Sequence, residues 1–258
     1  MNFPENSFTR GLAEGRKQFG IWVSLASPFA SEIVASAGFD FAVIDMEHAP
    51  NDLNSVLGQL QGFAPHPTSG LVRPQWNDSV LVKRLLDIGA PGLVFPMIQS
   101  AEEAAAAVSA CRYPPNGIRG VAGSNRANQF GRIPDYFERV EEEMSIIVQI
   151  ETLEAIACAD EIAAVEGVSG VFFGPSDIAA DMGHLGKPMT PEVWSDVIRP
   201  TARKLADKGM PVGTLVGDLN FAADLLSDEF AFVACSTEAV ALAKAMDSIV
   251  GTMRDLIK

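Results

Sequence analysis

Two acidic residues follow successive apolar runs of the sequence. Glu151 ends the run SIIVQIE, and Asp177 follows VSGVFFG after the turn Gly174-Pro175-Ser176. Carboxylate oxygens are the ligands that hard divalent ions such as Mg²⁺ and Mn²⁺ prefer. Either acid alone could simply favour the start of the helix that follows it. The two together, with Gln149 one strand period before Glu151, predict a divalent-metal site.

A histidine and an arginine follow two further apolar runs. The run FAVID ends in Asp45, three residues before His48, and Arg73 directly follows SGLV. A nearby carboxylate can orient an imidazole and raise its basicity, which suits a general base near neutral pH. A guanidinium can bind a carboxylate or stabilise an enolate oxygen, although a structural salt bridge would also explain Arg73. With the metal site, these residues indicate chemistry through an enolate.

Other kinds of site and partner are disfavoured by the composition. No lysine falls within an apolar strand candidate, which disfavours an aldolase that works through a Schiff base. The glycine-rich segment GIRGVAG lacks the spacing and the lysine of a phosphate-binding loop, so no nucleotide is expected. The net charge of −14 disfavours nucleic acid and anionic membranes as partners.

The cysteines and the N-terminal segment favour a cytoplasmic protein. The three cysteines lie far apart, and no spacing typical of a metal or disulfide framework appears. The N-terminal segment has no apolar signal region, and no apolar run approaches the length of a membrane span. We therefore expect reduced thiols and no membrane association.

The rest of the sequence alternates short apolar runs with segments of helical periodicity. The eight strand candidates are FGIWVSL, FDFAVID, GLVR, GLVFPMI, SIIVQIE, VSGVFFG, MPVGTLVG and FAFVACS. Nearly continuous apolar strands are typical of a parallel sheet covered on both faces. A chain of 258 residues with this alternation predicts one closed (β/α)₈ TIM barrel over residues 1–258, preceded by an N-terminal helix at about 5–17. Such barrels carry their chemistry at the carboxyl ends of the strands.

Two long segments between these elements are predicted to be functional loops. They span about residues 112–132 and 177–189, and both contain glycines at possible hinges. We expect lid or interface roles for Arg119, Arg126 and His184 in these loops, and for Asp87 in KRLLDIG. The two arginines and His184 could also bind the distal carboxylate of a diacid substrate, or they could have packing roles.

Several motifs together resemble the HpcH/HpaI aldolase family of metal-dependent class II pyruvate aldolases. They are IDMEHAPND, VRPQWND, KRLLDIG, RYPPNGIRGV, VQIET and FFGPSDIAADMGHLG, and the resemblance extends from GIWVSL to the last helix. It implies a TIM barrel assembled as a trimer or a hexamer, with the C-terminal helix exchanged between subunits. It also implies reversible cleavage of 4-hydroxy-2-oxo acids of the 2-dehydro-3-deoxyglucarate type to pyruvate, or a close 2-oxo acid, and an aldehyde. The cofactor would be Mg²⁺, Mn²⁺ or Co²⁺.

The resemblance also implies roles for individual residues. By motif, Glu151 and Asp177 resemble the metal ligands, His48 with Asp45 the base and its partner, and Arg73 the group that binds the pyruvyl oxygen. The expected substrate-binding residues are Trp22, Gln149, Gly174, Pro175, Ser176, Asp177 and Leu215. Met46 stands where close relatives often have glycine, and the segment after Val216 matches less well. These departures concern the choice of aldehyde more than the chemistry.

Two alternatives remain open from the sequence. A lyase of the wider phosphoenolpyruvate/pyruvate superfamily that acts on acyl-CoA thioesters would share the metal acids, but it would need a basic surface for the CoA phosphates. A metal-binding barrel without catalytic activity would be expected to lose the charged residues at the strand ends, which are present here.

Overall fold

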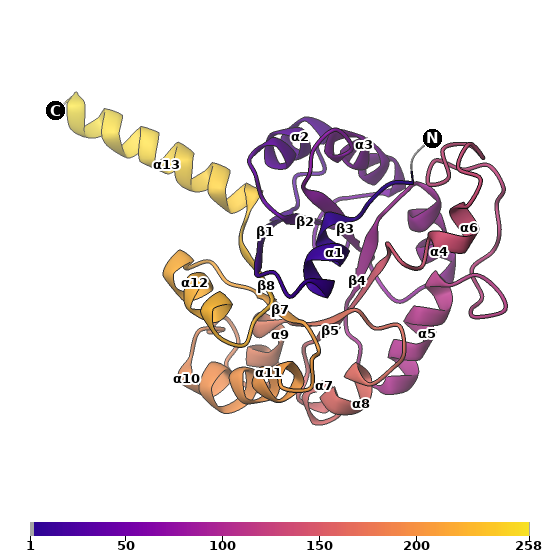
Figure 1. The fold of residues 1–258 in the computed structure, drawn as a ribbon. Helices are drawn as coiled ribbons and strands as arrows, with labels where there is room; N and C mark the ends of the chain where they lie inside the picture. The colour runs from indigo at the N-terminus through magenta and orange to yellow at the C-terminus, as the bar shows by residue number, and fades with distance from the viewer. Residues whose placement is uncertain (1–2, 258) are drawn as a thin grey trace.

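A closed barrel of eight parallel strands forms the centre of the molecule, as the sequence predicts (Figure 1). The structure is a computed structural model and describes residues 3–257. The strands are β1 (Gln18–Val23), β2 (Phe41–Asp45), β3 (Ser69–Arg73), β4 (Gly92–Phe95), β5 (Ser145–Ile150), β6 (Gly170–Phe173), β7 (Val212–Leu215) and β8 (Phe232–Thr237). They pair in chain order, and β8 closes on β1.

Helices surround the barrel and connect successive strands. They are α1 (Ser7–Ala13), α2 (Pro28–Ser36), α3 (Leu53–Phe63), α4 (Ser79–Asp87), α5 (Ala101–Cys111), α6 (Tyr136–Arg139), α7 (Leu153–Ala157), α8 (Ala159–Ala163), α9 (Pro175–Asp181), α10 (Pro191–Val193), the π-helical turn η1 (Trp194–Ile198), α11 (Arg199–Ala206), α12 (Leu219–Ser227) and α13 (Glu238–Leu256). Side-chain oxygens of Asp52, Asp78, Ser100 and Thr152 accept backbone N–H groups at the starts of α3, α4, α5 and α7. These caps satisfy donors that a helix start leaves free.

Aromatic side chains fill the barrel interior and close its amino-terminal end. Phe8 of α1 is fully buried, and its ring lies 5.1 Å from that of Phe41 and 5.3 Å from that of Phe232. Trp22 contacts Phe172 nearer the other end of the barrel, with ring centroids 5.7 Å apart. Because α1 and these rings block the amino-terminal end, a substrate can enter the barrel only from the carboxyl ends of the strands.

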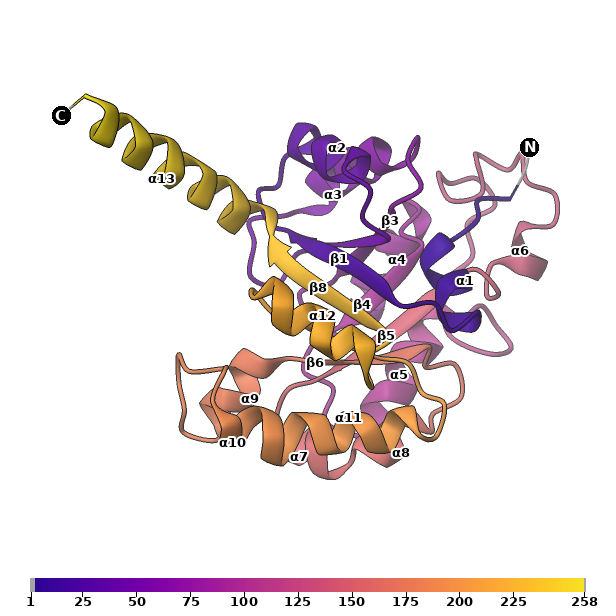
Figure 2. The ribbon, with the colours of Figure 1, turned by 60° about the vertical axis from the view of Figure 1, so that its left-hand side comes forward.

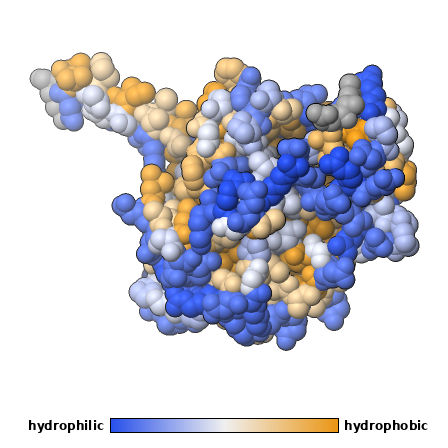
Figure 3. All heavy atoms as spheres, viewed as in Figure 1, coloured by the Kyte–Doolittle hydropathy of each residue, from blue (hydrophilic) through white to orange (hydrophobic). Residues whose placement is uncertain are grey.

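The C-terminal helix α13 projects away from the barrel (Figures 1 and 2). Only Glu238, at its first turn, is buried, and this carboxylate accepts the N–H groups of Ser24 and Leu25. Apolar side chains beyond that turn are exposed, and Figure 3 shows apolar residues along the projecting helix. Among residues 3–257, no helix is long and apolar enough to cross a membrane.

The two long segments expected to be loops differ in structure. Residues 112–135 contain no helix or strand, in agreement with the prediction. The segment 177–189, in contrast, begins inside α9 (Pro175–Asp181), and only its second part is a loop. The expectation of a loop from residue 177 is therefore wrong for its first part. Pro175 stands at the first helical position, where proline favours the start of a helix.

Candidate active site at the carboxyl ends of the strands

Arg73 lies at the centre of a charged cluster at the ends of β2 and β3. It is the register partner of Asp45, and its Nε and Nη2 atoms each donate to the Asp45 carboxylate at 2.8 Å. Its Nη1 atom lies 2.7 Å from Glu47, and its guanidinium stacks on Trp22, 4.1 Å from the ring centroid. The side chain is buried and held on three sides. A guanidinium has five N–H groups, so two remain to donate to a substrate oxygen.

Asp45 binds the backbone of His48, whereas the sequence led us to expect a contact with its imidazole ring. Its Oδ1 atom accepts the backbone N–H groups of Glu47 and His48, at 3.0 and 3.4 Å, while the rest of the carboxylate pairs with Arg73. The carboxylate near the imidazole is that of Glu47, with 3.9 Å between Oε2 and Nε2. Asp45 therefore fixes the turn that carries His48, and the imidazole itself is largely exposed at the rim.

Glu47 is a site residue to which the sequence reasoning gave no role. It lies between Arg73 and His48, and its half-buried carboxyl has a raised pKa. Desolvation by burial is the main cause of this increase, and the positive charge of Arg73 opposes it. The signal was available in the sequence, since Glu47 stands next to His48 in the segment after β2.

Glu151 is buried at the end of β5 without a cationic partner in hydrogen-bond contact. Its Oε1 atom accepts the N–H of Met97 at 2.7 Å, and its Oε2 atom accepts Gln149 Nε2 at 2.5 Å. Burial raises the pKa of this carboxyl from its ordinary value of 4.5 to about 7; the Met97 hydrogen bond opposes the shift, and the charges of Asp177 and Glu47 add to it. The carboxylates of Glu151, Asp177 and Glu47 thus lie close together, and the positive charge of Arg73 offsets them in part. A bound cation would stabilise such a group of carboxylates.

Asp177 and its turn complete the acidic region. Asp177 is exposed in the first turn of α9, which starts after Gly174. A Cβ atom on Gly174 would lie 2.5 Å from Glu151 Oε2 and 3.1 Å from Gln149 Nε2, so only glycine lets this turn approach the Glu151 carboxylate. The N–H groups of Ser176 and Asp177 belong to the first turn of α9, where a helix has no internal partner for them.

The cluster fits a divalent ion that is only partly held by the protein. Within residues 3–257, no three His, Cys, Asp or Glu side chains are grouped to hold a metal by themselves. Glu151 and Asp177 would thus supply two ligands, and water or substrate oxygens the rest, as is usual for Mg²⁺. Two buried polar atoms beside them, Gln149 Oε1 and Trp22 Nε1, have no hydrogen-bond partner in the part of the chain described. Such atoms are rare in folded proteins and indicate a place for a ligand.

Comparison with known proteins identifies the family. Residues 18–245 match the sequence pattern of the HpcH/HpaI aldolase/citrate lyase family. The chain belongs to this family. It is 46% identical over 249 residues to a pyruvate aldolase of Rhizobium etli, an alignment that covers 96% of this chain and 98% of that protein. It is 45% identical over 246 residues to a 4-hydroxy-2-oxo-heptane-1,7-dioate aldolase of Escherichia coli, covering 95% and 94% of the two chains.

A solved structure supports the same assignment. The crystal structure of an HpcH/HpaI aldolase/citrate lyase family protein from Burkholderia cenocepacia superimposes with a TM-score of 0.91 and 36% identity, over 96% of this chain and 99% of that one. The relatives confirm the predicted HpcH/HpaI resemblance and the expectation of an aldolase-type lyase.

Two of the four expected lid or interface residues of this HpcH/HpaI protein pair with each other away from the acidic cluster. Asp87 ends α4, and its carboxylate accepts Arg119 Nη2 at 2.9 Å. Arg119 is fully buried and stacks on Tyr113. Because α4 runs from the end of β3 to the start of β4, this pair lies toward the amino-terminal end of the barrel. Within one chain, Arg119 is therefore too distant to bind a substrate at Glu151.

Arg126 lies at the same amino-terminal end, and His184 at the other. Arg126 donates to the carbonyl oxygens of Ile88 and Leu60, at the ends of α4 and α3. His184 follows α9, and its N–H donates to Ala179 at 2.7 Å. Of the three residues considered for a distal carboxylate, only His184 thus lies on the side of the barrel that carries Asp177. Leu215, expected near the aldehyde, ends β7 and packs against the interior cluster that includes Trp22.

The pKa of Glu151 predicts how the stability of the metal-free protein depends on pH. Below about pH 4.5 the carboxyl is protonated in both the folded and unfolded chains; between 4.5 and about 7 only the folded chain keeps the proton. The free energy of unfolding should therefore fall as pH rises through this window, by roughly 3 kcal/mol. Urea unfolding in EDTA at several pH values would measure the fall. Glu151→Gln should remove most of this fall, leaving the smaller part that the raised pKa of Glu47 contributes, and Glu154→Gln should not change it. An equal slope in Glu151→Gln would contradict the assignment.

Proposed function

We propose that this protein is a divalent-metal-dependent class II aldolase that reversibly cleaves 4-hydroxy-2-oxo acids to pyruvate, or a close 2-oxo acid, and an aldehyde. The observation that carries the proposal is the pair of Glu151 and Asp177 next to the fixed guanidinium of Arg73. The names of the Rhizobium etli and Escherichia coli relatives support this class of substrate.

Glu151 and Asp177 would hold the ion, which supplies Lewis-acid polarisation of the substrate keto group when bound. The two free N–H groups of Arg73 would donate to the same oxygen as negative charge develops on it. His48 would take the proton of the C4 hydroxyl, so that a carbonyl forms at C4 as the C3–C4 bond breaks. The electrons of that bond form the enolate, and a proton from water added at C3 gives pyruvate while His48 releases to water the proton that it took from the C4 hydroxyl, so the protons balance.

The carboxylate of the 2-oxo acid would meet the turn at the start of α9. The N–H groups of Ser176 and Asp177 lie in its first turn, and Pro175 fixes the backbone there. Gly174 lets this turn approach Glu151, so the carboxylate and the keto oxygen could be held on one side of the cluster. Trp22, Gln149 and Leu215 would form the remaining walls of the substrate site.

A substrate panel tests the proposed reaction. Purified protein with Mg²⁺ or Mn²⁺ should release pyruvate from 4-hydroxy-2-oxo acids, measured with a coupled lactate dehydrogenase assay. The panel should contain diacids and neutral sugar acids together with malyl-type CoA thioesters. Cleavage of the thioesters alone would favour the acyl-CoA lyase alternative, and no cleavage of any compound would favour a barrel without catalytic activity. Equal rates for diacids and neutral acids would show that no side chain of the site, His184 included, selects substrates with a distal carboxylate.

The projecting helix supports a second part of the proposal, that the chain forms a homo-oligomer in which α13 packs on another subunit. Its exposed apolar side chains include Val240, Leu242, Met246, Ile249, Val250, Met253 and Leu256. Phe29 and Ile33 of α2 are exposed by 74% and 59% and offer an apolar surface on the barrel itself. Apolar patches of this kind mark interaction sites in soluble proteins. We propose a trimer or hexamer.

A charge placed on α13 tests the assembly. Ile249 is 57% exposed in one chain, so Ile249→Glu should not disturb the barrel but should disfavour burial of this helix against a partner. Light scattering coupled to size-exclusion chromatography should show the wild-type protein as a trimer or hexamer and the variant as a smaller species. Lys244→Asp on the same helix serves as the control for a change of charge alone. A monomeric wild-type protein, or an unchanged mass for Ile249→Glu, would contradict the assembly.

A further inference from the structure

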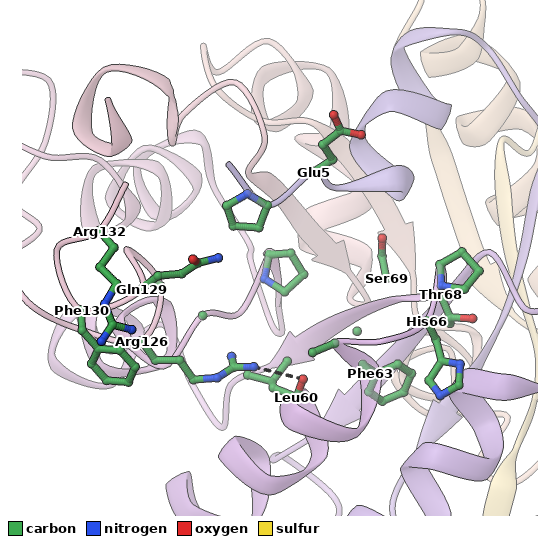
Figure 4. A pocket seen from close by; sticks show the side chains of 17 residues that line it. Glu5, Leu60, Phe63, His66, Thr68, Ser69, Arg126, Gln129, Phe130 and Arg132 are labelled. Carbon is green, nitrogen blue, oxygen red and sulfur yellow. Dashed lines mark hydrogen bonds between the residues drawn. The ribbon is translucent and has the colours of Figure 1, made fainter. Parts of the chain in front are cut away.

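A cavity lies at the amino-terminal end of the barrel, away from the acidic cluster. It has a volume of about 510 Å³, which is within the range of small-molecule sites. It lies between the end of α3, the start of β3 and the long loop that contains Arg126. Figure 4 shows Arg126, Gln129, Phe130 and Arg132 on one side of the pocket and His66, Thr68 and Ser69 on the other.

Three of the polar side chains that line this cavity are without hydrogen-bond or ion-pair partners in the described residues. Within residues 3–257, the side chains of His66, Gln129 and Arg132 make no hydrogen bond or ion pair, and the guanidinium of Arg132 lies 5.9 Å from the centroid of the Phe130 ring. Thr68 and Ser69 differ, because their hydroxyl groups already bond to Phe39, Asn6 and other neighbours. Three free polar groups around one cavity leave donors for a ligand on both of its walls.

The cavity carries positive charge in a protein whose net charge is −14. Arg126 is half-buried and meets only carbonyl oxygens, and burial without a carboxylate partner lowers the pKa of its guanidinium. Arg132 adds a second positive charge. The one acidic residue among those that line the pocket, Glu5, forms an exposed ion pair with Arg10 at 2.7 Å, and Arg10 also pairs with Glu143. The lining therefore carries two arginines against one partly offset carboxylate. A local positive field of this kind attracts anions.

The loop is held over the cavity in a strained backbone conformation. Gln129, Phe130 and Gly131 have φ angles of 51°, 60° and 80°, a left-handed conformation that is unfavourable for the first two. This backbone keeps Phe130 exposed at the pocket rim, while Leu60 and Phe63 line it from α3. The hydrogen bonds of Arg126 to the ends of α3 and α4 give this residue a structural role. No such role accounts for the positions of Gln129 and Arg132 or for the apolar side chains that line the cavity.

From these contacts we propose that the cavity is a binding site for a small organic dicarboxylate. Carboxylates match the guanidinium groups of Arg126 and Arg132 and the donors of Gln129 and His66. The apolar side chains of Leu60, Phe63 and Phe130 would cover the carbon skeleton, which inorganic phosphate lacks. The site is separate from Glu151 and Asp177, so its occupancy does not depend on the metal.

Titration calorimetry with glutarate on EDTA-treated protein tests this proposal, because glutarate has no keto group and the metal is absent. Binding with a Kd on the order of 1 mM or tighter is expected, and phosphate should bind at least about tenfold more weakly. Arg132→Ala changes an exposed loop side chain and Gln129→Ala a partly buried one, and each should weaken glutarate binding about tenfold. Lys208→Ala, which removes a distant positive charge, should leave it unchanged.

Three results of the binding measurements would overturn the proposal. They are no glutarate binding at concentrations on the order of 10 mM, phosphate binding as tight as glutarate, and equal glutarate affinity in the wild-type protein and Arg132→Ala. Thermal melts should show that the loop variants remain folded. Arg126→Lys provides a second test that keeps the charge but loses the planar fork, and it should also weaken glutarate binding. A crystal soaked with glutarate should show it against Arg126 and Arg132; density only at the acidic cluster would overturn the assignment.

Discussion

Removal of divalent metal should abolish pyruvate release, and added Mg²⁺, Mn²⁺ or Co²⁺ should restore it. Glu151 is buried with a pKa of about 7, and the nearby carboxylates of Asp177 and Glu47 raise that pKa further. Without a cation, these charges repel each other and would also repel a 2-oxo acid. Lewis-acid stabilisation of an enolate is worth several kcal/mol, so the loss of rate should reach about a thousandfold or more.

Two single substitutions distinguish loss of the metal site from a nonspecific loss of structure. Glu151→Gln keeps the shape of the side chain and its hydrogen bond from Met97, but removes the negative charge. It should lower both metal affinity, measured by calorimetry, and turnover. Glu154→Gln, in the exposed first turn of α7, is the matched control and should keep both. Full turnover of rigorously metal-free protein would refute the proposed mechanism.

The sequence predicts the barrel well because its physical signals are local. Each strand is an almost continuous apolar run, and longer helices such as α3 and α4 carry their own periodicity and their own caps. The positions of Glu151, Arg73 and Asp45 follow from the same argument, since all three lie at or directly after a strand end and parallel strands bring those ends together.

Side-chain pairing in the site could not be predicted from the sequence. The register places Asp45 directly opposite Arg73, so the carboxylate pairs with the guanidinium and reaches His48 only through its backbone. Sequence spacing alone suggested a contact with the imidazole. The path of the long loop could not be predicted either, because residues 112–135 have no periodicity. In the structure this loop places Arg119 and Arg126 at the amino-terminal end of the barrel.

Replacing Arg73 should affect the chemical step more than substrate binding. Arg73→Lys keeps a positive charge beside Asp45 and Glu47 but loses the planar fork that makes two bonds of 2.8 Å to Asp45. The ammonium group cannot hold Asp45 and also donate to the enolate oxygen in the same geometry. We expect kcat to fall by about a hundredfold to a thousandfold, the usual cost of losing one donor to a developing oxyanion, with a smaller change in KM.

Stability must be measured alongside this rate, because Arg73→Ala would leave Asp45 buried without its partner. Loss of one member of a buried ion pair can cost about 3–5 kcal/mol, so a low rate for that variant could reflect unfolding alone. Arg73→Lys avoids most of this cost. Arg10→Lys, which alters an ion pair with Glu143 at the other end of the barrel, is the control for exchanging arginine for lysine. If Arg73→Lys kept the wild-type kcat while remaining folded, Arg73 would be a structural residue that holds Asp45, and the enolate would need another donor.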